Sequence, residues 1–161
     1  MKDQPLDSID LTIPAKPDFV GIVRLLVSGI ANRMGFSYDD IEDLKLAVSE
    51  ACTNAVDHAY SGGDGDIEVN CNLFGDRLEI NVIDRGHSFD VNEVEQRTGP
   101  IGFEPSMNAL RERGLGIYLM KTLMDDVEIK GDNGVIVKLT KHLRKNEVEL
   151  HVKSPASYPY R

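Results

Sequence analysis

The sequence of 161 residues contains little cysteine and no long apolar run. Its two cysteines, Cys52 and Cys71, occupy apolar positions of predicted elements, so we interpret them as small buried hydrophobic residues of a reducing compartment and not as a disulfide. No apolar segment reaches the roughly 18 residues that a membrane-spanning helix needs, and no N-terminal segment has the charged-then-apolar pattern of a signal peptide. These absences predict a cytoplasmic protein without membrane association.

Basic residues are also scarce. Lys and Arg number 18 against 27 Asp and Glu, which gives a formal net charge of -9. Proteins that bind the phosphate backbone concentrate Lys and Arg in order to displace counterions, so direct binding of nucleic acid is not expected. An acidic surface would suit a protein partner with basic patches, and it would equally serve solubility alone.

The chain length suits one domain with a substantial core. Apolar alternation predicts a first strand at 9–13, a hairpin at 67–82 and a second hairpin at 127–140. Helical periodicity predicts a helix that ends at Gly35, one that Ser37 caps, and one at 117–124. This order predicts an α+β fold: a two-layer sandwich with helices on one face of a mixed, mainly antiparallel sheet. We assign residues 1–144 to the domain and 145–161 to a flexible tail.

The second helix places Glu50, Asn54 and His58 on one side, because residues four apart in a helix are neighbours. A carboxylate and an amide could there accept a hydroxyl proton and hold a hydrated metal. The same positions lie opposite the apolar stripe of the helix, where an ordinary solvated face is also expected. His58 has no second ligand residue at metal-binding spacing, so we interpret it as a packing or orienting residue.

Two glycine-bearing segments follow that helix. Asp84 ends the apolar run 78–83 and precedes Gly86, so a carboxylate stands at a strand tip beside a permissive backbone. Gly114 and Gly116 open the third helical pattern, where backbone N–H groups can meet phosphate oxygens. The intervening residues 86–114 lack regular periodicity and are predicted to form a lid over a ligand. Together these segments point to a nucleotide site.

In this order and spacing, four segments resemble the N, G1, G2 and final boxes of the GHKL ATPase and kinase superfamily. They are Val48–Val56, Ile83–Gly86, Arg113–Met120 and Val137–Lys141. More narrowly, the chain is similar to the anti-sigma serine kinases of the bacterial general stress response, from about Ile9 to Arg144. The resemblance implies a Bergerat-type ATP-binding fold.

The resemblance also implies roles for individual residues. Glu50 would be the catalytic base, and Asn54 would be the Mg²⁺ ligand. Asp84 would accept a hydrogen bond from the adenine amino group, with the Thr140 hydroxyl close to both. The ATP-binding residues implied are Asn54, Asp84, Gly86, Arg111, Arg113, Gly114, Gly116 and Thr140, and either arginine could be the one that reaches a phosphate.

The function implied is that of an ATP- and Mg²⁺-dependent protein serine kinase that is also an anti-sigma factor. Such a protein sequesters a stress-response sigma factor, and thereby regulates transcription, and it phosphorylates a serine of an anti-anti-sigma antagonist. The resemblance further implies a homodimer. The alternative is a non-catalytic ATP-binding module for partner switching. Glu50 favours the enzyme, because binding alone does not require a base.

Overall fold

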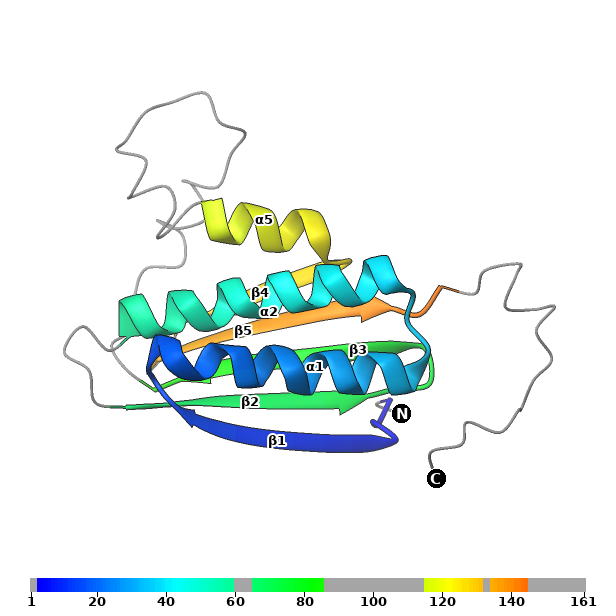
Figure 1. Ribbon diagram of the computed structural model, residues 1–161, viewed down its shortest axis with the longest axis horizontal. Helices are drawn as coiled ribbons and strands as arrows, with labels where there is room; N and C mark the ends of the chain where they lie inside the picture. Colours follow the sequence, from blue (N-terminus) through cyan, green and yellow to red (C-terminus); the bar gives the residue numbers. More distant parts are fainter. Residues whose placement is uncertain (1–2, 60–64, 86–114, 132–133, 145–161) are drawn as a thin grey trace, which may run out of the picture.

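The computed structural model describes residues 3–59, 65–85, 115–131 and 134–144. Five strands, three α-helices and one 3-10 turn make up these ranges (Figure 1). In chain order they are β1 (Asp7–Pro14), η1 (Pro17–Phe19), α1 (Val20–Met34), α2 (Tyr38–Ala59), β2 (Asp66–Leu73), β3 (Arg77–Asp84), α5 (Leu115–Leu123), β4 (Asp126–Lys130) and β5 (Val135–His142). The predicted tail, 145–161, lies outside the described residues, so the proposed division of the chain stays a prediction.

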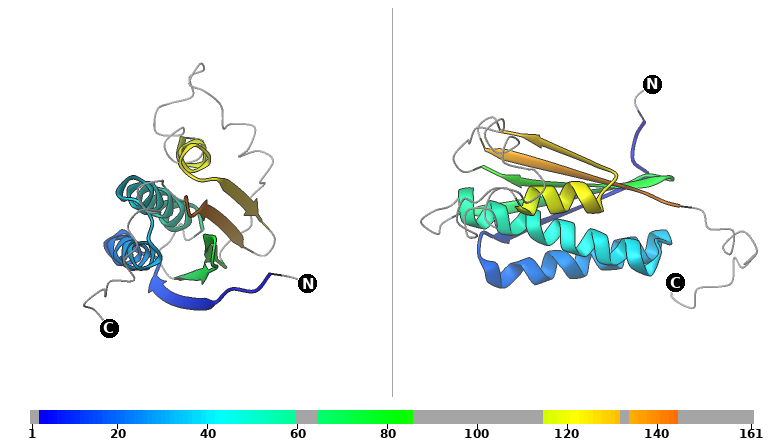
Figure 2. Two further views of the ribbon diagram at one scale, coloured as in Figure 1. Left: turned by 90° about the vertical axis from the view of Figure 1, so that its right-hand side faces the viewer. Right: turned by 90° about the horizontal axis from the view of Figure 1, so that it is seen from above.

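The strands form one sheet in the order β1-β2-β3-β5-β4. All four neighbouring pairs are antiparallel. The predicted α+β sandwich is confirmed, except that the described sheet has no parallel pair and is therefore not mixed. The three helices lie together on one face of the sheet, as both views in Figure 2 show. The last described strand, β5, lies between β3 and β4 and is therefore an inner strand of the sheet.

The sequence signals for the helix boundaries match the structure. Gly35 adopts a left-handed conformation with a φ of 92° and ends α1, and its N–H donates to the carbonyl groups of Ala31 and Asn32. A residue with a Cβ is strained at such a φ, so glycine is favoured here. Ser37 then caps α2, because its Oγ accepts a hydrogen bond from the Asp40 N–H at 3.2 Å. These two signals fix where α2 begins.

The core fills the space between the helices and the sheet. Leu44 of α2, Met120 of α5 and Ile80 of β3 are completely buried in it. Both cysteines are buried and free, as predicted. Burial raises the pKa of Cys52 to about 12, with a smaller contribution from the neighbouring Cys71. Because the thiolate is the reactive form, such thiols are chemically inert in the folded protein.

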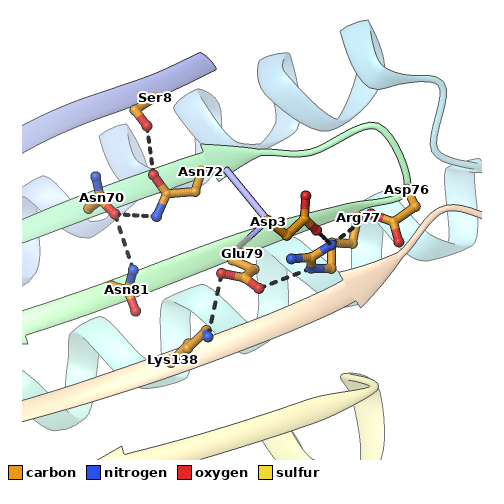
Figure 3. Close-up of polar contacts among 9 residues, drawn as sticks. All are labelled: Asp3, Ser8, Asn70, Asn72, Asp76, Arg77, Glu79, Asn81 and Lys138. Atoms are coloured by element: carbon orange, nitrogen blue, oxygen red, sulfur yellow. Dashed lines mark hydrogen bonds and ion pairs between the residues drawn. The ribbon is translucent and has the colours of Figure 1, made fainter. Parts of the chain in front are cut away.

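The other face of the sheet is polar and its side chains bond to one another (Figure 3). The Asn70 side-chain oxygen accepts hydrogen bonds from the amides of Asn72 and Asn81, at 2.8 and 3.1 Å. Further along β3, Glu79 pairs with Arg77 at 3.0 Å and with Lys138 at 3.4 Å. These contacts hold β2, β3 and β5 in register from the outside. In the described part of the chain, no helix is long and apolar enough to cross a membrane.

We predict that Leu44→Ala lowers the free energy of unfolding by about 2–5 kcal/mol, because it leaves a cavity among close-packed side chains. Leu25→Ala is the matched control, since Leu25 of α1 is 75% exposed and should change stability by less than about 0.5 kcal/mol. Urea denaturation of both variants measures the difference. Equal losses would contradict the assignment of the core.

Candidate nucleotide site

Three elements end or begin on the same side of the molecule. The C-terminal part of α2, the start of α5 and the end of β3 lie together at the left of Figure 1. Each carries residues that the sequence assigned to a nucleotide site, namely Glu50 and Asn54 on α2, Gly116 on α5 and Asp84 on β3. Residues far apart in the sequence are therefore gathered at one end of the sandwich.

Gly116 of α5 lies close to the polar side chains of Glu50 and Asn54 on α2. A Cβ on Gly116 would lie 3.0 Å from Glu50 Oε2, 3.2 Å from Asn54 Nδ2 and 3.4 Å from Asn54 Oδ1. Glycine thus lets the first turn of α5 pack directly against the carboxylate and the amide. Glu50 and Asn54 are accordingly only partly exposed. Their side of α2 is a contact surface between helices and not the fully solvated face that the helical pattern alone also allowed.

Asp84 is the last residue of β3, and only 4% of it is exposed. It faces the helix layer, since it alternates in phase with the buried Ile80 and Val82. Its place at the end of a strand suits recognition of the edge of a base.

Gly134 shapes the backbone beside Asp84, and it lies inside the second hairpin predicted from the sequence, at 127–140. Its φ is 123°, and a Cβ there would overlap the Asp84 carbonyl oxygen and lie 2.9 Å from Arg85 Cα. Only glycine fits without displacement. The next residue, Val135, pairs with Asp84 in the sheet and points to the same face. The available signal was a glycine directly before the final strand, but its meaning depends on the β3–β5 register.

Thr140 does not lie beside Asp84. In the β3–β5 ladder Thr140 pairs with Glu79, five positions from Asp84, which corresponds to about 16 Å along a strand. Alternation also places Thr140 on the outer face of the sheet, opposite the helices. The expectation that its hydroxyl lies near Asp84 is therefore wrong, and its contact with adenine stays a prediction. The resemblance identified the strand correctly, whereas the face of each residue follows from a register that the sequence does not specify.

The remaining predicted site residues lie outside the described residues. They are Gly86, Arg111, Arg113 and Gly114, and the side chain of His58 is likewise not described. Their roles stay predictions.

The described donors suit a hard metal ion that is also bound by phosphates. The Asn54 side-chain oxygen and the Glu50 carboxylate are oxygen donors in partly exposed positions beside the start of α5. Among the residues described, no group of three or more His, Cys, Asp or Glu side chains could hold a metal alone. Mg²⁺ commonly takes one or two protein ligands, substrate phosphates and water, so it fits this donor set better than a metal that needs a complete protein cage.

Comparison with known proteins identifies the class. The family model for the histidine kinase-like ATPase domain matches residues 13–141. The crystal structure of the RsbU and RsbW domains of a Mycobacterium tuberculosis protein superposes with a TM-score of 0.63 at 23% identity, covering 88% of this chain and 34% of that longer chain. The chain belongs to the histidine kinase-like ATPase family, and the similarity of the solved structure extends to the fold.

Relatives with about half of their residues identical place the chain in one group of this family. The serine-protein kinase RsbW of Halalkalibacterium halodurans is 52% identical over 146 residues, which cover 91% of this chain and 90% of the relative. The serine-protein kinase RsbW of Bacillus licheniformis is 53% identical over 145 residues, covering 89% and 90% respectively. Within the ATPase family, the chain belongs with the RsbW serine-protein kinases.

We predict that Gly116→Ala lowers phosphotransfer at least about tenfold, because the new methyl group displaces the Glu50 carboxylate and the Asn54 amide. Stability should change by less than about 1 kcal/mol, since alanine favours a helix by about that amount and offsets the crowding. Gly29→Ala in α1 is the matched control, because nothing lies within 4 Å of the added Cβ. That variant should be slightly more stable and fully active. We would measure ATP-dependent phosphorylation of a protein substrate and the thermal unfolding of each variant. Transfer by Gly116→Ala at the wild-type rate would contradict the proposed position of the site.

Proposed function

We propose that this protein uses ATP to phosphorylate a serine of an anti-anti-sigma protein and that, as an anti-sigma factor, it sequesters a sigma factor. The close packing of Gly116 against Glu50 and Asn54 carries the proposal. It brings a potential base, a potential metal ligand and a helix N-terminus together, which is the set of groups that phosphoryl transfer needs. The similarity to the RsbW serine-protein kinases supports the same reaction.

Phosphoryl transfer depends on alignment and charge neutralisation more than on covalent chemistry by the protein. In the proposed reaction the serine oxygen attacks the γ-phosphorus, the bond to the β-phosphate oxygen breaks, and ADP leaves. Glu50 accepts the proton of the serine hydroxyl. Backbone N–H groups at the start of α5 donate to phosphate oxygens. Asn54 would hold a Mg²⁺ ion, which neutralises phosphate charge when bound.

The base of ATP is assigned to the other end of the site. Asp84 accepts a hydrogen bond from the adenine amino group, and its burial excludes competing water. Gly134 lets its backbone pass close to the backbone of Asp84, while Val135 supplies an apolar neighbour on the same face. Adenine is thereby distinguished from guanine, which presents a carbonyl oxygen where adenine presents an amino group.

The partners are proposed on the same basis. A sigma factor and an anti-anti-sigma substrate follow from the family, as does a homodimer, and the net charge of -9 suits partners with basic patches. A non-catalytic partner-switching module that only binds ATP is the second candidate. The presence of a carboxylate at Glu50, where an amide would suffice for binding, favours the enzyme.

We predict that Glu50→Gln retains ATP binding and loses about 10²- to 10⁴-fold in transfer rate, because the shape of the side chain is kept and its basicity is lost. Glu42→Gln is the matched control on the same helix, where Glu42 forms a partly exposed ion pair with Lys45 at 3.0 Å. It should transfer phosphate at the wild-type rate. Single-turnover transfer from radiolabelled ATP distinguishes the two candidate functions. Undiminished transfer by Glu50→Gln would exclude Glu50 as the catalytic base. Absence of transfer in the wild-type protein would favour the non-catalytic module.

Asp84→Asn should weaken ATP binding at least about tenfold and reduce the preference for ATP over GTP, because an amide can donate to the guanine carbonyl. Asp126→Asn on the exposed edge strand β4 is the control and should bind as wild type does. Calorimetric titration with both nucleotides tests this, and circular dichroism establishes that each variant is folded. An Asp84→Asn protein with unchanged ATP affinity would exclude the proposed adenine contact.

A further inference from the structure

A buried lysine lies at the opposite end of α5 from Gly116. Lys141 of β5 points into the helix layer, and only 3% of it is exposed. Its Nζ donates a hydrogen bond to the Leu123 carbonyl oxygen at 2.6 Å. The same Nζ lies 3.7 Å from Asp40 Oδ1 and 3.6 Å from Asp43 Oδ2. One ammonium group therefore joins the last residue of α5 to the first turns of α2.

The residues around Lys141 fasten the same end of α5. The Asp125 N–H donates to the Thr140 carbonyl at 3.0 Å, and the His142 N–H donates to Asp125 Oδ2 at 2.7 Å. Burial alone would raise the pKa of Asp125, but the His142 hydrogen bond and the charges of Lys141 and Arg144 outweigh it and lower that pKa. We call these contacts of Leu123 and Asp125 with β5 the α5 anchor. It holds the helix at its C-terminal end, where a cation is also favoured by the helix dipole.

The α5 anchor and the nucleotide site are connected through two rigid helices. Gly116 lies seven residues before Leu123 in α5, or about 10 Å along a helix axis. On α2, Asp43 lies seven residues before Glu50, a similar distance. The helices therefore run in opposite directions, with Lys141 of β5 bridging them at one end and Gly116 of α5 packed against α2 near the other. We expect a shift of α5 at the anchor to reach Gly116, because Leu115–Leu123 form one continuous short helix.

Stability alone does not account for a lysine at this position. Burying an ammonium group is costly, and replacing a buried ion pair by an apolar side chain of similar size is often neutral or stabilising. What the charge adds is a directional bond to one carbonyl oxygen, which fixes where α5 ends along α2.

We propose that Lys141 is a positioning residue for phosphate binding and transfer: it sets the axial position of α5 and so holds Gly116 against Glu50 and Asn54. The inference rests on the proposed kinase function. The proposal predicts an effect on phosphate binding and not on adenine binding. The reason is that α5 contributes only to the phosphate end of the site, while Asp84 on β3 contributes to the adenine end.

The test compares Lys141→Met with Lys138→Met. Methionine fills the volume of the lysine stem without its charge, and Lys138 lies on the outer face of the same strand, where it pairs with Glu79 at 3.4 Å. Three quantities are measured for each variant: the affinity for ATP with Mg²⁺, the affinity for adenosine, and the transfer rate at saturating ATP. In Lys141→Met we expect ATP affinity and transfer each to fall about tenfold or more, in line with the cost of misplacing reacting groups by about 1 Å. Adenosine affinity should stay within about twofold of wild type, and Lys138→Met should match wild type in all three measurements.

Two results would overturn the proposal. One is a folded Lys141→Met protein with wild-type ATP affinity and transfer. The other is an equal loss of ATP and adenosine affinity, which would indicate only a general structural role.

If Lys141→Met does not fold, Asp125→Ala loosens the same anchor from its more exposed side. The ratio of ATP affinity to adenosine affinity in that variant then decides. A reduced ratio supports the proposal, and an unchanged ratio overturns it. Failure of the kinase assignment itself is recognised separately, because wild type and Lys138→Met would then show no transfer.

Discussion

The arrangement of this protein depends on how closely α5 approaches α2, because a Cβ at residue 116 would crowd the side chains of Glu50 and Asn54. The apolar side of α2 packs on the sheet through Leu44, Val48 and Ala51, as in any amphipathic helix. Its Glu50 side would be an ordinary solvent face if α5 were absent. Packing of α5 converts that face into a partly enclosed polar surface. One side of α2 therefore belongs to the core, and the other side belongs to the nucleotide site.

Polar residues in this fold form two groups that differ in how deeply their side chains are buried. On the outer face of the sheet, Asn70, Arg77 and Glu79 are partly exposed and bond to neighbouring polar side chains. The buried polar residues of the described chain are Asp84, Thr140 and Lys141. All three lie on the adjacent strands β3 and β5. Burial of such groups requires compensation by specific partners, and they occur where the fold meets the nucleotide site or the end of α5.

Local sequence patterns predicted much of this structure. Periodicity and end signals such as Gly35 and Ser37 located the helices, because caps and apolar spacing act within a few residues. The approach of Gly116 to Glu50 could be anticipated only through the resemblance, since it joins residues from separate parts of the chain. The position of Thr140 was predicted incorrectly, and the importance of Gly134 was missed, for one physical reason. Both depend on the register between β3 and β5, and a shift of one residue would reverse the face of every side chain in the strand.

The insertion of β5 beside β3 also bears on how the chain can change during evolution. Pairing of Asp84 with Val135 requires the whole of residues 85–134 to be closed into a loop. The entropy of closing a flexible loop grows only with the logarithm of its length, at about 0.6 kcal/mol for each doubling. Insertions or deletions between these strands therefore have a weak thermodynamic penalty as long as α5 and β4 are kept.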